Sequence, residues 1–437
     1  MSSNPTTVQL TRELQDARQR TLALVEDLDD EQMIGPRLAI VNPLRWEIGH
    51  VAWFQEYWLL RHLCGRPPIL ADGDTLYDSA KIAHDTRWDL PLRSKVDTIA
   101  YMTKVIDDVA QHVPVADSSD RQSKETKYFL SLALFHEDMH GEAITYTRQT
   151  LGLPAPSLVH PNTTAAVEPI GIDTGDAFVP RGSFMIGSTA DKEFVFDNEQ
   201  KPCEVNVEAF AISRTATTNA EYLAFVADDG YQRRELWSEE GWHWRERANA
   251  DHPVYWKFEG AWWRRNFAEV VPLEGDLPIL HVNWYEAEAY CRWAGRRLPT
   301  ELEWEMAAST EVTTDGVISN RKRLYPWGDE EPTPNRANLN SERLSCVDVR
   351  ALPEGDSACG CRQMIGNVWE WTVSDFMPYP GFTPGPYKEY SAPWFGNHKV
   401  LRGGCWATRS RLINNTYRNF YMPDRRDVWA GFRTCAL

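Results

Sequence analysis

The chain has 437 residues, of which 42% are hydrophobic and 25% are charged, a composition that indicates two or three globular domains and excludes a disordered or collagen-like chain. Its 46 Lys and Arg are outnumbered by 63 Asp and Glu, and the formal net charge of −17 argues against nucleic acid or an anionic membrane surface as the main partner. No apolar run approaches the roughly 20 residues of a membrane span, and the polar N-terminus lacks an apolar signal core, so we expect a cytoplasmic protein.

Residues 1–155 are predicted to form a helical bundle. Apolar residues recur at steps of three and four over residues 10–28, and similar patterns predict helices over 43–62, 97–113 and 124–151. Prolines and glycines punctuate the intervals between these stretches. Four helices of this length pack naturally as a bundle, and bundle cores commonly host metal sites.

Residues 156–175 are rich in Pro, Thr, Ser and Gly and are predicted to be a linker. In residues 176–437, short apolar runs alternate with Gly, Asn, Asp and Pro clusters, and only three stretches look helical, namely 218–228, 284–294 and 300–308. This pattern predicts a loop-rich domain of short strands. The eight cysteines of the chain are too few for a disulfide scaffold, so we expect reduced, mostly buried thiols.

The strongest chemical signal is the segment FHEDMHGE at residues 135–142. His136 and His140 are four residues apart, so on a helix both imidazoles project from one face and can grip one metal ion. Glu142 is six residues beyond His136, about 240° round the helix, and therefore points away from that face. A third ligand must come from another helix.

His50 is the candidate for that third ligand, because it lies inside an otherwise apolar and aromatic helix, where a lone ionisable group needs a reason. Gly49 beside it allows another backbone or a substrate to approach closely. Three neutral imidazoles on one face of an ion leave the opposite positions open, which suits Fe(II), Zn(II) or Cu(II). The competing interpretation is that His50 is only a hydrogen-bonded core residue, and His62 and His84 are rival candidates.

Several segments of the second half are distinctive as strings of residues. Gly366 and Gly403 permit left-handed turns, and Trp369 and Trp371 alternate with Glu370, which places both rings on one side of an extended segment. The strings are FVFDNE (194–199), RLPTELEWE (297–305), YPWG (325–328), GNVWEWT (366–372), LRGGCW (401–406) and GFR (431–433).

These strings resemble the formylglycine-generating-enzyme fold, a C-type-lectin-like domain. Preceded by a DinB-like four-helix bundle that carries H-x-x-x-H-x-E, they make the chain similar to the ergothioneine sulfoxide synthase family over roughly residues 8–437. The resemblance implies a mixed fold, an α bundle followed by an α/β domain. It also implies a non-heme Fe(II) held by His50, His136 and His140. Members use O2 to join a thiol donor such as cysteine to C2 of the imidazole of Nα-trimethylhistidine (hercynine), giving a sulfoxide in ergothioneine biosynthesis.

The resemblance also implies roles for other residues. A tyrosine near the iron would act as a proton or electron source, and it falls in an interval where Tyr379, Phe382 and Tyr387 are all candidates, with Tyr77 or Tyr421 as substitutes if the position is Phe382. Arg87 would bind the carboxylate of the donor as a fork. The substrate-binding set that we predict is Arg87, Met139, Trp371, Asn419, Phe420 and Tyr421.

The chain departs from the family pattern in ways that leave the donor open. Met139 stands where actinobacterial members have Gln, and the stretch 419–422 (NFYM) lacks the Asp that contacts γ-glutamylcysteine in those members. The strings LYDS (76–79) and HDTRW (84–88) resemble the selenoneine synthase branch, which forms a C–Se bond between hercynine and a selenosugar. Two further alternatives are a formylglycine-generating oxidase and a non-catalytic metal- or ligand-binding protein.

Overall fold

The computed structural model describes residues 5–115, 117–158, 174–188, 194–312 and 318–437. The chain divides into two compact units, one built largely from the first 159 residues and the other from most of the remainder. The predicted linker at 156–175 lies mainly outside the described residues, and the first strand after it begins at Asp176. The predicted mixed fold is confirmed, because the first unit is helical and the second combines sheets with helices.

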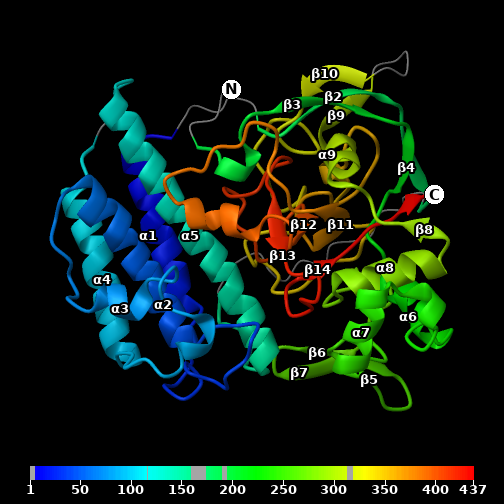
Figure 1. Ribbon diagram of the computed structural model, residues 1–437, viewed down its shortest axis with the longest axis horizontal. Helices are drawn as coiled ribbons and strands as arrows, with labels where there is room; N and C mark the ends of the chain where they lie inside the picture. Colours follow the sequence, from blue (N-terminus) through cyan, green and yellow to red (C-terminus); the bar gives the residue numbers. More distant parts are fainter. Residues whose placement is uncertain (1–4, 116, 159–173, 189–193, 313–317) are drawn as a thin grey trace. The chain divides into compact units, whose positions relative to one another are not determined.

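Four long helices form the first unit, and they lie side by side in Figure 1. They are α1 (Thr7–Ala23), α2 (Leu44–Gln55), α4 (Lys95–His112) and α5 (Arg121–Leu151). Each was predicted within a few residues from its apolar periodicity, except that the C-terminal half of the second predicted helix is a π-helix, η1 (Glu56–Leu63). Two short elements connect α2 to α4, namely α3 (Gly73–Tyr77) and the 3-10 turn η2 (His84–Thr86).

The ends of the bundle helices follow from local capping. Thr6, Ser94 and Asp120 each accept a hydrogen bond from the backbone N–H three residues on, at the starts of α1, α4 and α5 respectively. Gly152 ends α5 in the left-handed conformation at φ 65°. These caps allow α5 to run for 31 residues, and this length carries His136 and His140 into the middle of the bundle.

Short strands and helices build the second unit. One four-stranded sheet has the order β1 (Asp176–Val179), β4 (Phe210–Ser213), β15 (Cys435–Ala436), β8 (Arg296–Arg297), and another has the order β13 (Asn419–Tyr421), β12 (Lys399–Arg402), β11 (Trp369–Asp375), β14 (Ala430–Gly431). The smaller sheets pair β2 (Gly182–Ile186) with β3 (Cys203–Val207), β9 (Thr310–Val312) with β10 (Ile318–Lys322), and β5 (Trp256–Phe258) with β6 (Trp262–Asn266) and β7 (Glu269–Pro272).

The three helices predicted for this unit are present as α6 (Asn219–Ala227), α8 (Trp284–Trp293) and α9 (Glu301–Ser309). The capping box predicted from Thr300 and Glu303 is formed. The expectation of only three helical stretches was wrong, because α7 (Glu239–Ala248) also forms. Its sequence is mostly polar and contains a glycine, so its apolar periodicity is weak, and its cap at Ser238 and the burial of Trp244 stabilise it instead.

The alternation predicted around Trp369 and Trp371 is present on β11, the strand between β12 and β14. The first four residues of this strand are buried on both faces, so Glu370 is buried as well and receives a hydrogen bond of 2.6 Å from Nε of Arg433. The predicted left-handed glycines are confirmed, with φ 83° at Gly366 and 95° at Gly403.

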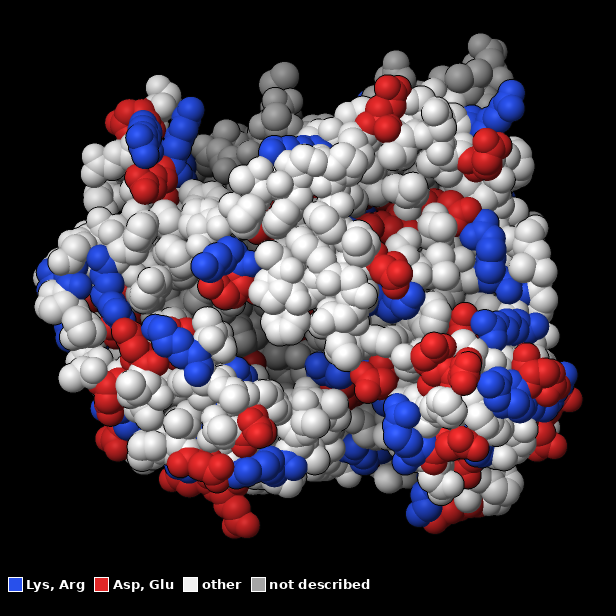
Figure 2. Space-filling model, viewed as in Figure 1, with Lys and Arg blue, Asp and Glu red and all other residues white. Residues whose placement is uncertain are grey.

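All eight cysteines have free thiols. In the part of the chain that the structure describes, no helix combines the length and the apolar character needed to cross a bilayer. On the face seen in Figure 2, basic and acidic side chains are interspersed, so the excess of acidic residues does not gather there into one patch.

Candidate metal centre

The bundle brings the three predicted ligands together. His50 projects from α2, and His136 and His140 project from consecutive turns of α5. One ring nitrogen of each lies within 4.8 Å of the others, and no other group of three or more His, Cys, Asp or Glu side chains meets this criterion among the described residues. The Nε2 atoms of His136 and His140 are 3.1 Å apart. Two nitrogens bound to one ion at right angles and about 2.1 Å from it lie about 3.0 Å apart, so this spacing fits shared coordination.

Hydrogen bonds to the outer ring nitrogens determine the tautomers of two of these imidazoles. Nδ1 of His50 lies 2.7 Å from the carbonyl oxygen of Tyr77, and Nδ1 of His140 lies 2.6 Å from Oε1 of Glu47. An ionised carboxylate and a carbonyl can only accept, so both Nδ1 atoms carry the hydrogen and both Nε2 atoms keep a lone pair. Such outer partners orient metal-binding histidines and raise their basicity.

Aromatic side chains pack against the faces of two of the rings. The Trp46 indole stacks on His50 with ring centroids 4.7 Å apart, and Phe54 stacks on His136 with ring centroids 3.6 Å apart. Because Trp46, His50 and Phe54 all belong to α2, this helix supplies one ligand and the aromatic support for two. The packing holds the rings in place and limits access of water to the cluster.

Electrostatics keep the buried imidazoles neutral. Burial, together with the nearby His140, lowers the pKa of His50 to about 3 and the pKa of His136 well below its ordinary value. Burial alone would raise the pKa of Glu47, but the charge and hydrogen bond of His140 outweigh it and lower that pKa to about 2. His50 and His136 therefore offer neutral nitrogen donors, and Glu47 is an ionised carboxylate beside His140, a set of groups that fits a divalent ion such as Fe(II) or Zn(II).

Gly49 serves the cluster differently from the prediction. A Cβ added there would lie 2.2 and 2.5 Å from two ring carbons of Tyr77 and 2.8 Å from its hydroxyl oxygen. The Tyr77 side chain therefore occupies the space in which a backbone or a substrate was expected. The close packing fixes Tyr77, whose carbonyl oxygen accepts the hydrogen of His50. Glycine at this position thus supports the orientation of a ligand.

The two rival histidines do not join the cluster. Nε2 of His84 lies 3.0 Å from the carbonyl oxygen of Val41, and the ring of His62 packs against Trp58 and Phe129. Their interactions explain their presence in the bundle without a metal.

Arg87 packs against Trp46, the residue that also stacks on His50. Its guanidinium stacks 3.8 Å above the Trp46 ring and donates a 2.6 Å hydrogen bond to Oδ1 of Asn42. Asn42 in turn donates through Nδ2 to Glu47, at 2.8 Å. Arg87 is therefore connected to the cluster through both a ring stack and a hydrogen-bond chain. Met139, also in this unit, is half-buried on α5.

Tyr379, Tyr387 and the remaining substrate-binding candidates belong to the second unit, whereas Tyr77 is a buried residue of the first. The Tyr379 hydroxyl is buried and donates to Glu301 at 3.2 Å, and Arg418 stacks on its ring. Burial raises its pKa well above the ordinary value for tyrosine. Tyr387 is half-buried, and its ring centroid lies 6.3 Å from that of Tyr390. Tyr379 is thus part of a buried ion network, whereas Tyr387 lies nearer the surface.

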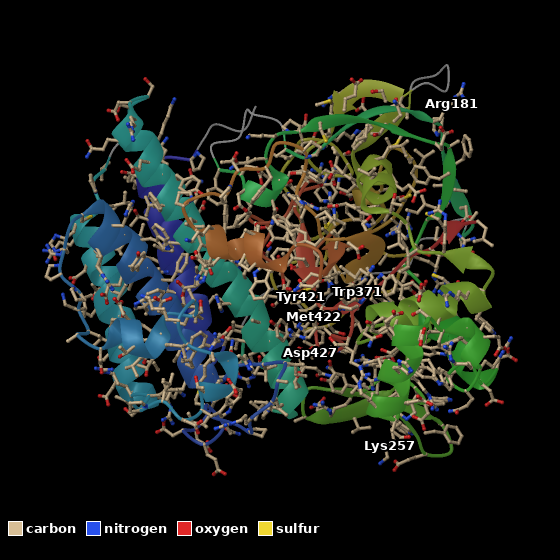
Figure 3. The ribbon with its side chains drawn as sticks, in the orientation of Figure 1. Arg181, Lys257, Trp371, Tyr421, Met422 and Asp427 are labelled. Carbon is tan, nitrogen blue, oxygen red and sulfur yellow. The ribbon has the colours of Figure 1, made fainter. Side chains whose placement is uncertain are left out.

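The other candidates share one sheet. Trp371 on β11 and Asn419 on β13 both pair with Leu401 on β12, and Figure 3 labels Trp371 and Tyr421 in this region. The Trp371 indole is buried and donates to the carbonyl oxygen of Val282 at 2.9 Å. Residues 419–421 are half-buried, and Phe420 stacks on Phe376 with ring centroids 4.0 Å apart.

Sequence analysis missed the residues that orient the ligands. Glu47 precedes His50 by three residues and so lies on the same helical face, a signal that could have identified it. The carbonyl of Tyr77 and the ring of Phe54 carried no such signal, because their contacts depend on how α3 and α5 pack against α2.

Both parts of the chain match known protein families. Residues 13–144 match the DinB superfamily, and residues 171–436 match the sulfatase-modifying factor enzyme 1-like domain. The formylglycine-generating enzyme of Streptomyces coelicolor is 31% identical over 60% of this chain and 88% of its own.

Other relatives match nearly the whole chain, across both of these domains. The hercynine oxygenase of Mycolicibacterium thermoresistibile is 38% identical over 98% of this chain and 95% of its own, and that of Mycobacterium tuberculosis is 38% identical over 97% and 98%. With this degree of identity along its full length, the chain belongs to the hercynine oxygenase family, also called the ergothioneine sulfoxide synthases.

Proposed function

We propose that this protein is a non-heme Fe(II) enzyme that uses O2 to join a thiol donor to C2 of the hercynine imidazole, giving a sulfoxide and water. The observation that carries the proposal is the three-histidine cluster at His50, His136 and His140 in a chain that belongs to the hercynine oxygenase family. The C2–H and S–H hydrogens and one oxygen atom leave as water, and the other oxygen atom stays on sulfur.

The histidines would hold Fe(II) from one side and leave its other positions open to substrates. Bound Fe(II) would supply the one-electron chemistry that reaction with O2 requires. Neutral imidazoles, maintained by the lowered pKa values of His50 and His136, leave the two positive charges of the ion uncompensated. An uncompensated dication favours an anionic thiolate as a partner. The hydrogen bond that Nδ1 of His140 donates to Glu47 leaves the lone pair of Nε2 available to bind the metal.

Substrate recognition is assigned to the residues that the family resemblance identified. The trimethylammonium group of hercynine prefers aromatic faces, which the half-buried Phe420 and Tyr421 would provide. Trp371, predicted from the sequence for the same role, is fully buried beneath the surface of the second unit. Arg87 would bind the donor carboxylate as a planar fork, with Met139 and Asn419 completing the set. We propose Tyr379 or Tyr387 as the proton source, and Phe replacements at both positions, compared for the ratio of sulfoxide to oxidised thiol, would identify it.

A second candidate keeps the site and changes the donor to a selenosugar, which gives a C–Se bond. The observation that favours it is where the two selenoneine-like strings lie. Tyr77 of the first string accepts the hydrogen of His50, and Arg87 of the second stacks on Trp46 beside the same ring. The segments that resemble the selenium branch are therefore those that surround one of the candidate ligands.

Anaerobic loading with Fe(II), followed by O2 uptake and product mass with hercynine, tests both candidates. Cysteine, γ-glutamylcysteine and a selenosugar are supplied in parallel, and the product mass identifies the donor. His136→Ala should abolish iron retention, whereas the matched change His62→Ala, in the same bundle but outside the cluster, should leave it intact. Iron retained by His136→Ala, or no hercynine-dependent O2 uptake with any donor, would contradict the proposal.

A further inference from the structure

One buried arginine links all four helices of the bundle. Nε of Arg18 on α1 donates to Oε1 of Glu137 on α5 at 2.8 Å, and Nη2 donates to Oε1 of Gln55 on α2 at 2.8 Å. Nη1 donates to the carbonyl oxygen of Met102 on α4 at 2.5 Å. The Gln55 amide also donates to Glu137. We refer to Arg18, Gln55 and Glu137 as the Arg18 network.

The Arg18 network adjoins the histidine cluster on both helices that carry ligands. Glu137 directly follows His136, and Gln55 directly follows Phe54, the ring that stacks on His136. The bond between Glu47 and His140 crosses between the same two helices at the other side of His50. Helices α2 and α5 are therefore tied to each other on both sides of the cluster.

Burial makes a purely stabilising role a poor explanation for the network. Arg18, Gln55 and Glu137 are 2%, 0% and 1% exposed. The desolvation free energy of a buried ion pair is about as large as the attraction between its charges, so well-packed apolar residues would stabilise the bundle at least as well. Directional hydrogen bonds add something that apolar packing does not, which is a single arrangement of the helices that they join.

We propose that the Arg18 network positions the three-histidine cluster. It would set the spacing and register of α2 and α5, and thereby the convergence of the ring nitrogens of His50, His136 and His140. The inference rests on the metal site of the proposed function and extends it to residues that touch neither ligand atoms nor substrates.

The test uses the full chain and Co(II), whose visible absorption reports coordination geometry. The double change Arg18→Met and Glu137→Met removes both charges at similar volume. We expect cooperative unfolding to be retained, Co(II) affinity to fall by about 10- to 100-fold, the range for partners that orient metal ligands, and the absorption spectrum to shift.

A control removes another ion pair of the same bundle, in which the arginine is buried and its partner Asp27 is exposed. Arg148 on α5 is fully buried, and its Nη2 lies 2.7 Å from Asp27. It is eleven residues beyond Glu137, about 16 Å along the helix. Arg148→Met with Asp27→Leu should therefore leave Co(II) affinity and the spectrum unchanged. If burial of an arginine alone mattered, loss of Arg148 would weaken Co(II) binding as much as loss of Arg18.

The outcomes separate this proposal from the proposed function. If the unaltered protein takes up no Co(II) that His136→Ala loses, the metal site itself is wrong and this inference falls with it. If the unaltered protein binds Co(II) and the Arg18 and Glu137 double variant binds it equally well with the same spectrum, only the positioning role is overturned. If the double variant does not fold, Gln55→Met decides, with an expected loss of about tenfold in affinity and unchanged affinity as the contrary result.

Discussion

Replacement of Glu47 by glutamine should weaken metal binding without altering any ligand. The carboxylate accepts from Nδ1 of His140 at 2.6 Å and from Nδ2 of Asn42 at 2.8 Å. Asn42 cannot reverse its amide without cost, because its Oδ1 accepts from Arg87. Glutamine has one oxygen for these two donors, so in Glu47→Gln one donor must face the new NH2 group.

The size of the effect follows from these two contacts. Hydrogen bonds to a charged group contribute about 1.5–3 kcal/mol and neutral ones about 0.5–1.5 kcal/mol, so loss of the charge alone costs about 1–1.5 kcal/mol. Loss of a partner that orients a metal ligand typically weakens metal affinity by about 10- to 100-fold, which corresponds to about 1.4–2.7 kcal/mol. The lost charge and the unsatisfied donor together make a loss of at least this size the expected result. Glu47→Ala should reach the upper end, since it removes both acceptors.

The assay is Co(II) or Fe(II) affinity measured by competition with a chelator, with O2 uptake in the presence of hercynine as a second readout. Glu13→Gln, at a half-buried position of α1 outside the cluster, is the control and should bind metal like the unaltered protein. Glu47→Gln protein with unchanged affinity would show that the carboxylate does not orient His140, and the reasoning from the hydrogen-bond geometry would be refuted.

Three further changes test the packing and the charges. Gly49→Ala should lower the free energy of unfolding by about 1–2 kcal/mol, since overpacking of up to about 3 kcal/mol outweighs a helix-propensity gain of about 1 kcal/mol. Gly141→Ala, whose new methyl would lie 3.7 Å from its nearest neighbour, should instead stabilise the protein. Urea unfolding measures both variants, and a loss of stability in Gly141→Ala as well as in Gly49→Ala would contradict this reasoning. Burial lowers the pKa of His281 from 6.5 to about 3. Between pH 6.5 and about pH 3, the unfolded chain therefore binds a proton that the folded chain does not. The free energy of unfolding then falls by about 1.4 kcal/mol for each pH unit that the pH is lowered. His281→Phe should remove that contribution in urea titrations across this range, and an unchanged slope would count against it. Arg433→Met removes the cation that pairs with the buried carboxylate of Glu370 and should lower the free energy of unfolding by about 3–5 kcal/mol. Thermal unfolding measures this loss, and Arg233→Met, at the surface, is the control.

Local patterns were sufficient for much of the fold. Periodicity identified the four bundle helices and three helices of the second unit, because an amphipathic helix must bury one face wherever it packs. The same patterns did not identify the π-helical continuation of α2 or the polar helix α7. Although Ser238 caps α7 locally, η1 packs against α4 and α5, and Trp244 of α7 packs against Tyr285 of α8. These contacts come from neighbouring elements, which no local pattern contains.

The sequence by itself determined that His136 and His140 share one face of a helix, because the spacing of a regular helix requires it. It also carried the strings that relate the chain to its family. The meeting of His50 with that pair, the bond from Glu47 to His140, the carbonyl of Tyr77 behind His50 and the four-helix contacts of Arg18 were decided only by the tertiary structure. Each joins segments that are far apart in the chain, and their distances depend on how whole helices pack, a sum over many side chains that no single stretch of residues specifies.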